Sequence, residues 1–213
     1  MKHLAILGAS GHGKVVADCA ECAGWSDVVF FDDAWPKLKE NGVWHVVGDT
    51  GNLLRNLHRY DGVIVAIGDN EMRLKKQNEL LERAANVVSV IHPHARVSRY
   101  MKLGIGSVVM AGAVVNVDSR LGSGCIINTG ATIDHDCVLG DGVHVSPGAH
   151  LAGGVVVGDR SWVGIGSSIR QLIEVGENTI IGAGAAVVKN ITGNCTVSGI
   201  PAMLLEHKNK LNR

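Results

Sequence analysis

The sequence predicts a chain in two parts, a small doubly wound α/β domain over residues 1–92 and a parallel β-helix over residues 93–213. Two observations carry this prediction. Strand-like and helix-like segments alternate before residue 92, and an aliphatic residue recurs at every sixth position from Ile91 to Val187. The alternation is typical of a parallel sheet covered by helices, whereas a period of six fits the hexapeptide repeat of a β-helix.

The six-residue period keeps its register without a slip. Three hexads make one triangular coil, so each aliphatic side chain should fill the prism and stack on its equivalent in the next coil. Most of these positions are preceded, two residues earlier, by a small residue that should occupy a crowded inward site. The aliphatic residues are Ile91, Val97, Leu103, Val109, Val115, Leu121, Ile127, Ile133, Leu139, Val145, Leu151, Val157, Val163, Ile169, Val175, Ile181 and Val187.

Glycine often follows the aliphatic residue, as at Gly104, Gly122 and Gly140. We expect these glycines to form the turns between strands, where a positive φ favours a residue without a side chain. The repeat decays after Val187, and the sequence SGIPA at 198–202 and a polar tail at 204–213 follow it.

The elements expected in the α/β domain follow from hydrophobic runs and turn residues. Polar loops should separate them, and His92-Pro93-His94 should mark the join to the β-helix. The expected elements are strands at 3–7, 28–33, 62–68 and 87–91, helices at 14–23, 52–60 and 70–85, and a loop at 34–49.

Three loops should lie at the carboxyl ends of these strands, where open parallel sheets bind ligands. The first is the glycine-rich GASGHG at 8–13, which contains Ser10, Gly11 and His12 and would present backbone amides to a phosphate. Its spacing is not that of the dinucleotide fingerprint, and a plain strand-to-helix turn is the alternative. The other two loops contain the carboxylates of Asp32 and Asp33, which could instead be a solvated turn, and Gly68.

Composition excludes several classes of protein. Twenty Lys and Arg balance twenty Asp and Glu in the 213 residues, so the net charge does not favour nucleic acid or an anionic membrane as a partner. No apolar run is long enough to span a bilayer. Five cysteines without disulfide spacing fit a reducing cytoplasm, and the pair Cys19 and Cys22 is expected on a helix in ordinary packing.

The segment 128–150 interrupts the apolar pattern of the repeat with Asp134-His135-Asp136. A carboxylate bonded to one imidazole nitrogen raises the basicity of the other, as a general base requires; a solvated surface histidine is the alternative. His135, His144 and His150 could also meet across a subunit interface as zinc ligands. Within one chain His144 and His150 should lie on different faces of the prism.

These motifs together resemble the acetyl-CoA-dependent sugar acetyltransferases of the bacillosamine and sialic-acid acetyltransferase family. The segments that carry the resemblance are GASGHG, FFDD, AIGDNEMR, the stretch 128–150, the repeat and the closing GIPA. The resemblance implies a Rossmann-like nucleotide-sugar-binding domain, a left-handed β-helix and a homotrimer with active sites between subunits. It also implies transfer of acetyl from acetyl-CoA to the 4-amino group of a UDP-4-amino-4,6-dideoxy sugar in bacterial glycan synthesis, without a metal.

The resemblance also implies residue roles. His135 would be the general base and Asp136 the residue that raises its basicity. The nucleotide-sugar site and the acetyl-CoA site would lie on different domains. The sugar site would comprise Ser10, Gly11, His12, Asp32, Asp33 and Gly68, and the acetyl-CoA contacts would be His144, Ile165 and Ala183, the last of which is glycine in the family.

Other functions remain open from the sequence. An O-acetyltransferase for sialic acid or an N-acetyltransferase for a GDP- or dTDP-amino sugar would have a similar glycine-rich loop. A zinc hydro-lyase of the γ-carbonic anhydrase type shares the β-helix, although the nucleotide-type domain argues against it. A structural or nucleotide-sensing protein is a further alternative. The base, the sugar stereochemistry and the pathway are not specified by these residues.

Overall fold

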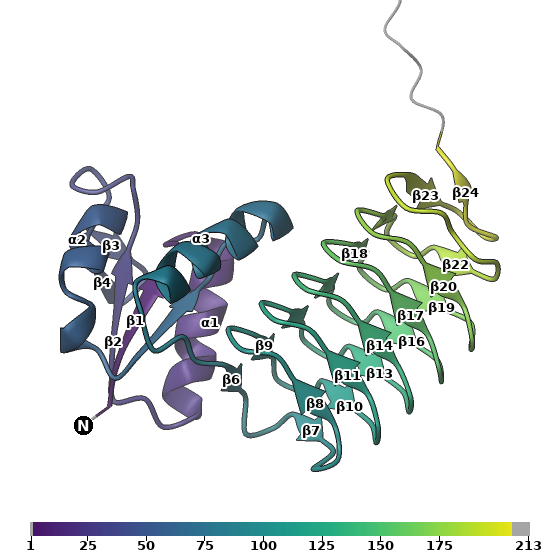
Figure 1. Cartoon of the computed structure of the whole chain (residues 1–213), viewed down its shortest axis with the longest axis horizontal. Helices are drawn as coiled ribbons and strands as arrows, with labels where there is room; N and C mark the ends of the chain where they lie inside the picture. The colour runs from purple at the N-terminus through teal and green to yellow at the C-terminus, as the bar shows by residue number, and fades with distance from the viewer. Residues whose placement is uncertain (1, 206–213) are drawn as a thin grey trace, which may run out of the picture.

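The computed structural model describes residues 2–205 and contains an α/β domain followed by a β-helix (Figure 1). The α/β sheet has the strand order β3-β4-β2-β1-β5. All its strand pairs are parallel except the β3–β4 hairpin. Its elements are β1 His3–Leu7, α1 Gly11–Cys22, β2 Asp27–Phe31, β3 Glu40–Asn41, β4 Trp44–Gly48, α2 Thr50–Arg55, the 3-10 helix η1 Leu57–Arg59, β5 Gly62–Val65 and α3 Asn70–Glu82.

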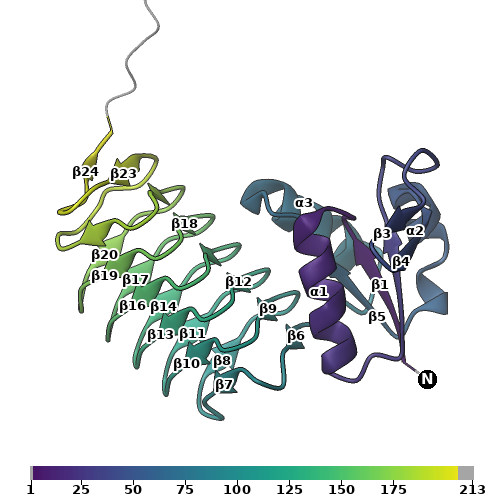
Figure 2. The same ribbon diagram turned by 180° about the vertical axis from the view of Figure 1, so that it is seen from behind.

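Strand β1, which lies between β2 and β5 in the sheet, is buried on both faces because helices or the β-helix cover each one. On one face, Leu4 and Ile6 pack with α1 residues and with Val108 and Ile126 of the β-helix. On the other face, Leu7 packs with residues of α2 and α3. The first cluster includes residues of both parts of the chain, so the α/β domain and the β-helix share an apolar core. Figure 2 shows α1 next to β6, the first strand of the β-helix.

Three expectations about this domain are wrong. The stretch 34–49 is not a loop throughout, because β3 and β4 form a hairpin there and β4 extends the sheet beside β2. The segment 87–91 is not a fourth strand of the α/β sheet. Val87 makes only an isolated bridge to Val63, whereas β6 Val90–Ile91 pairs with β9 of the β-helix. The first helix also begins at Gly11 rather than at residue 14.

The β-helix consists of two-residue strands in three sheets, and each strand pairs in parallel with the strand 18 residues away, as Val114 does with Thr132. Three parallel sheets with this repeat are typical of a left-handed β-helix. Its strands are β6 Val90–Ile91, β7 Arg96–Val97, β8 Lys102–Leu103, β9 Val108–Val109, β10 Val114–Val115, β11 Arg120–Leu121, β12 Ile126–Ile127, β13 Thr132–Ile133, β14 Val138–Leu139, β15 His144–Val145, β16 His150–Leu151, β17 Val156–Val157, β18 Trp162–Val163, β19 Ser168–Ile169, β20 Glu174–Val175, β21 Ile180–Ile181 and β22 Ala186–Val187. The last coil adds β23 Thr196–Ser198 and the antiparallel β24 Met203–Leu204.

The second residue of most of these strands is the aliphatic residue of the six-residue period. From Val109 to Val187 these side chains are buried, and small residues such as Ala131, Cys137 and Ser161 lie inward beside them at 0% exposure. The predicted register is confirmed. The strand β24 at Met203–Leu204 is not predicted by the sequence, which indicates only a polar tail from residue 204. Residues 206–213 of that tail lie outside the described part of the chain.

The glycines that follow the aliphatic residue have a different role from the one expected. They do not adopt positive φ; the residues two positions later do, such as Gly106, Gly124 and Gly142. A Cβ on Gly104 would instead collide with the backbone of Gly122 in the next coil. Glycine at this first position therefore permits close stacking of coils, and glycine at the second permits the turn itself.

Candidate active site

His135 lies on the exposed turn between β13 and β14. Its backbone amide donates to Asp134 Oδ1 at 2.8 Å, and its carbonyl accepts the Gly154 amide at 2.9 Å. Asp134 also accepts the Asn116 side-chain amide. The bond from the His135 amide is the larger cause of the lowered Asp134 pKa, and the bond from Asn116 is the next. The turn is therefore fixed by the coils on either side of it, and the imidazole projects from a rigid wall.

Asp136 holds the His135 ring through a hydrogen bond of 2.7 Å between Oδ2 and Nδ1. Asp136 has a φ of 59°, in the left-handed region that aspartate tolerates better than most residues. This bond is the main cause of a raised His135 pKa, and the Asp134 carboxylate adds to it. With Nδ1–H directed to the carboxylate, Nε2 carries the free lone pair and can accept a proton.

Gly153 leaves the space that the His135 ring occupies. It stands in the next coil, and a Cβ built there would lie 2.6 Å from both Cε1 and Nε2 of the imidazole. A side chain at this position would push the ring aside. The Gly153-Gly154 pair is visible in the sequence, but the sequence does not show that Gly153 lies against His135. That contact depends on the stacking of successive coils.

The glycine-rich loop joins β1 to α1 as a tight turn. A Cβ on Gly13 would collide with the Gly8 carbonyl, whereas a Cβ on Gly11 would have no atom within 4 Å. Gly13 therefore serves the turn. Ser10 and Gly11 are exposed at the N-terminus of α1, where backbone amides can receive an anion.

The two predicted carboxylates have structural partners. Asp32 accepts the Ala9 amide at 2.8 Å and the Ala34 amide at 2.9 Å, so it shapes the glycine-rich loop directly. Asp33 accepts the Thr50 amide at 2.9 Å, which is the largest cause of its lowered pKa. Both carboxylates keep oxygen lone pairs that could accept from a ligand. The structure places Asp32 against the glycine-rich loop and leaves Asp33 largely exposed after β2.

His12 and His144 bring the two parts of the chain together. His12 comes from the glycine-rich loop and His144 from β15, and their ring centroids are 6.4 Å apart. Asn128 Nδ2 lies 3.2 Å from His144 Nε2, and the Trp162 ring lies 4.3 Å from the His144 ring. His12 Nε2 and His144 Nδ1 are buried without a hydrogen-bond partner among the described residues.

Burial, followed by the nearby Arg73 guanidinium, lowers the pKa of His12 to about 4 and that of His144 to about 3. Both rings are therefore neutral at pH 7. Two neutral imidazoles with free nitrogen atoms could donate to, or accept from, a polar ligand between the domains.

Ile165 and Ala183 occupy the same turn position in consecutive coils, because the Gly184 amide donates to the Ile165 carbonyl. Both are exposed. Their turns follow β18 and β21, strands of the sheet that also contains His144. The structure thus gathers the three predicted acetyl-CoA contacts along one side of the prism.

Apart from Asp136, the structure does not bring His135 to the other predicted residues. His135 lies where the sheets of β13 and β14 meet, whereas His144 belongs to the third sheet. His150 lies on the sheet of β13, so His144 and His150 are on different faces, as expected. Among residues 2–205, no group of three His, Cys, Asp or Glu is placed to hold a metal ion.

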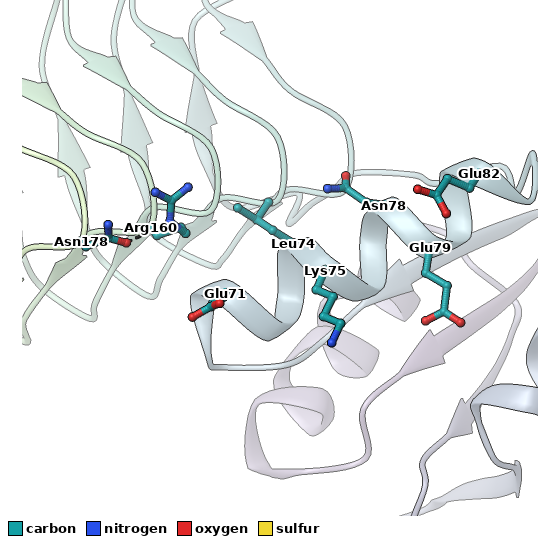
Figure 3. Close-up of a pocket in the computed structure, with 8 residues that line it drawn as sticks. All are labelled: Glu71, Leu74, Lys75, Asn78, Glu79, Glu82, Arg160 and Asn178. Carbon is teal, nitrogen blue, oxygen red and sulfur yellow. Dashed lines mark hydrogen bonds between the residues drawn. The ribbon is translucent and has the colours of Figure 1, made fainter.

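The sequence does not predict the role of α3, whose side chains bond to stacked turns of the β-helix. Gln77 donates to the Ile105 carbonyl, Arg73 to the Gly124 and Gly142 carbonyls, and Asn70 to the Arg160 and Ser161 carbonyls. Beyond the helix a groove of about 950 Å³ opens, and Figure 3 shows Glu71 and Leu74 of α3 facing Arg160 and Asn178 of the coils. None of the predicted site residues lines it.

A nucleotide-type α/β domain on a hexapeptide β-helix with an open imidazole–carboxylate pair defines an acyltransferase of the hexapeptide class. Two family models match, the PglD N-terminal domain over residues 3–80 and the bacterial transferase hexapeptide (six repeats) over residues 118–153. Together with the relatives below, they show that the chain belongs to the PglD family of acetyltransferases, and the predicted family and fold class are confirmed.

The acetyltransferase domain of PglB from Neisseria gonorrhoeae, solved with acetyl coenzyme A, is 41% identical with a TM-score of 0.92, over 96% of this chain and 99% of that one. PerB from Caulobacter crescentus, solved with CoA and GDP-perosamine, is 37% identical with a TM-score of 0.89, over 97% and 98%. The UDP-N-acetylbacillosamine N-acetyltransferase of Bacillus subtilis is 34% identical over 113 residues, which is 52% of each chain.

Proposed function

We propose that this protein transfers acetyl from acetyl-CoA to the 4-amino group of a UDP-4-amino-4,6-dideoxy sugar in bacterial glycan biosynthesis. The observation that carries the proposal is the 2.7 Å bond between His135 Nδ1 and Asp136, which leaves Nε2 as a base on an open turn. The family to which the chain belongs, and relatives solved with acetyl coenzyme A or with CoA, support the choice of donor.

The chemistry needs one base and no covalent enzyme intermediate. The sugar ammonium first releases one proton to water, which leaves a neutral amine that can attack the thioester carbonyl. His135 Nε2 accepts a second proton from this nitrogen as the C–N bond forms, and collapse of the tetrahedral adduct breaks the C–S bond. The CoA thiolate leaves and takes the proton back. Cys125 and Cys137 are buried in the prism, which argues against either as a nucleophile.

The two substrates have separate sites in this proposal. The nucleotide sugar lies at the carboxyl ends of β1, β2 and β5. Acetyl-CoA lies along the sheet of the prism that contains β15, β18 and β21. The sugar site is Ser10, Gly11, His12, Asp32, Asp33 and Gly68, and the acetyl-CoA site is His144, Ile165 and Ala183.

We further propose a homotrimer in which His135 of one subunit faces the substrates held by another. Support comes from the position of His135, which lies across the prism from the sheet of His144. A cytoplasmic location is part of the same proposal, because acetyl-CoA is the donor and all five cysteines are free. Among residues 2–205, no helix is long and apolar enough to cross a bilayer.

A panel of nucleotide-linked 4-amino sugars tests the proposal. CoA release should be fastest with a UDP-linked sugar, and sedimentation should show a trimer. Gly11→Val, whose added side chain meets no neighbouring atom at its Cβ, should weaken UDP-sugar binding in calorimetry while acetyl-CoA binding stays close to normal. Absence of CoA release with every amino sugar, from a folded protein, would contradict the proposed activity.

A GDP-linked 4-amino sugar is the second candidate. PerB, solved with GDP-perosamine, aligns over 97% of this chain, whereas the match to the UDP-N-acetylbacillosamine enzyme spans 52% of it. The same panel distinguishes the two, because the base that gives the higher kcat/KM identifies the substrate.

A further inference from the structure

Helix α3 lies along one corner of the β-helix and bonds to the same turn position in successive coils. The acceptor carbonyls belong to the stacked turns at 105–106, 124, 142 and 160–161, each about one coil from the next. Gln77, Arg73 and Asn70 supply the donors, and their spacing of four and three residues places them on one face of the helix.

Arg73 stands at the centre of this interface and is 1% exposed. Its Nε donates to Gly124 O at 2.7 Å and its Nη2 to Gly142 O at 2.8 Å, both in the β-helix. Nη1 donates to Ile67 O at 2.9 Å and to Gly68 O at 3.1 Å, in the loop after β5. Nη2 also donates to Asn70 Oδ1 at 2.8 Å.

No carboxylate forms a salt bridge with Arg73 among the described residues. Burial lowers the pKa of Arg73 to about 10, so the guanidinium keeps its charge at neutral pH. A buried cation without a paired anion is costly unless hydrogen bonds satisfy its donors, and here backbone carbonyls from both domains do so. Replacing it with lysine would lose the planar fork that reaches three segments at once.

We propose that Arg73 is a positioning residue for the acetyl transfer, because its guanidinium ties the sugar-binding loop at Ile67 and Gly68 to the turns at Gly124 and Gly142. This inference rests on the proposed function, in which Gly68 borders the nucleotide sugar. Arg73 touches neither substrate in this view. It sets the distance between the α/β domain, which holds the sugar, and the β-helix, which holds the thioester.

Steady-state kinetics of Arg73→Lys and Arg73→Gln test the proposal in the full chain. Loss of the fork should let the loop move, and a misplacement of about 1 Å is enough to reduce catalysis roughly 100-fold. We expect kcat/KM for the nucleotide sugar to fall roughly 10- to 100-fold in Arg73→Gln and less in Arg73→Lys, through a lower kcat and a higher KM for the sugar, with KM for acetyl-CoA within about twofold of wild type.

Gln77→Met is the matched control. It breaks a bond from α3 to the Ile105 turn but touches neither Ile67 nor Gly68, so it should lower Tm while leaving KM for the sugar unchanged. If Arg73→Gln does not fold, the lysine variant decides. An unchanged sugar KM in a folded Arg73 variant, or an equal rise in both KM values, overturns the inference. Absence of turnover by wild type with every amino sugar would instead refute the proposed function.

Discussion

Two corners of the same prism have matching turn geometry and different surroundings. At the helix corner, the turn positions beneath α3 are glycine, namely Gly106, Gly124 and Gly142. They change to Arg160, where Asn70 at the first turn of α3 bonds, and to Asn178 beyond it. At the histidine corner the turns after β10, β13, β16 and β19 lie open, and the corresponding positions are Asp118, Asp136, Gly154 and Leu172. All nine have positive φ.

The difference between the two corners separates two reasons for having glycine at a turn, which are positive φ and close packing. Positive φ alone does not require it, because Asp118, Arg160 and Leu172 adopt the same conformation. At the helix corner a Cβ on Gly142 would lie 2.7 Å from Leu74 Cδ1 and 3.4 Å from the Asn70 carbonyl. Packing against α3 therefore adds a requirement that the backbone alone does not impose. The open corner is free of it, and a functional side chain such as Asp136 can stand there.

The largest effect should come from the histidine corner. His135→Ala should lower kcat by about 10²–10⁴-fold, the usual share of a general base, with little change in KM for acetyl-CoA. The side chain is exposed, so its removal should not disturb the core. The rate should recover in part at high pH, where the sugar amine is already neutral. A folded variant with wild-type kcat at pH 7 would remove this residue from the chemistry.

The helix corner should respond in stability rather than in chemistry. Gly142→Ala should lower the free energy of unfolding by about 2–5 kcal/mol, since positive φ costs about 1–2 and overpacking about 1–3 kcal/mol. Asp118→Gly is the matched change at the open corner and should stay within about 0.5–1 kcal/mol of wild type. Urea denaturation measures both. Equal losses in the two variants would show that α3 packing does not distinguish the corners.

Gly153→Ala should affect catalysis through packing at the histidine corner. The added Cβ would lie 2.6 Å from His135 Cε1 and Nε2, so the ring must move away from its present position. We expect kcat to fall roughly 10- to 100-fold, as a displacement of about 1 Å at a reacting group allows, while KM for acetyl-CoA changes less. A crystal structure of the variant with the imidazole unmoved, or an unchanged kcat, would contradict this.

The smallest effect should be a shift in pH dependence. Hydrogen bonding to Asp136 raises the His135 pKa, so the base becomes free only above the ordinary value of about 6.5. Asp136→Asn should therefore move the acid limb of the kcat/KM profile to lower pH, and should also lower the plateau because the ring is a weaker base. Asp118→Asn, one coil away, is the control and should leave the limb in place.

Much of the fold was predictable because its determinants are local. The period that places Ile133 and Val145 inside the prism depends only on spacing along the chain, and the structure buries both completely. The Asp134-His135-Asp136 turn was also visible, since its bonds join adjacent residues. Gly68 and Asp32 could be placed at one sheet edge because parallel strands end together.

The rest depended on contacts between residues far apart in the sequence. Val90–Ile91 could complete either sheet by its own propensity, and pairing with β9 decided the matter. Arg73 looked like one of several charges on α3 until the glycine turns of the β-helix surrounded it. The sequence by itself determined the β-helix, its register and the His135–Asp136 pair on its surface. Only the tertiary structure decided which corner of the prism α3 covers and which corner stays open for chemistry. The physical reason is that α3 comes from a distant part of the sequence, and its packing determines whether a turn position such as Gly142 has room for a side chain.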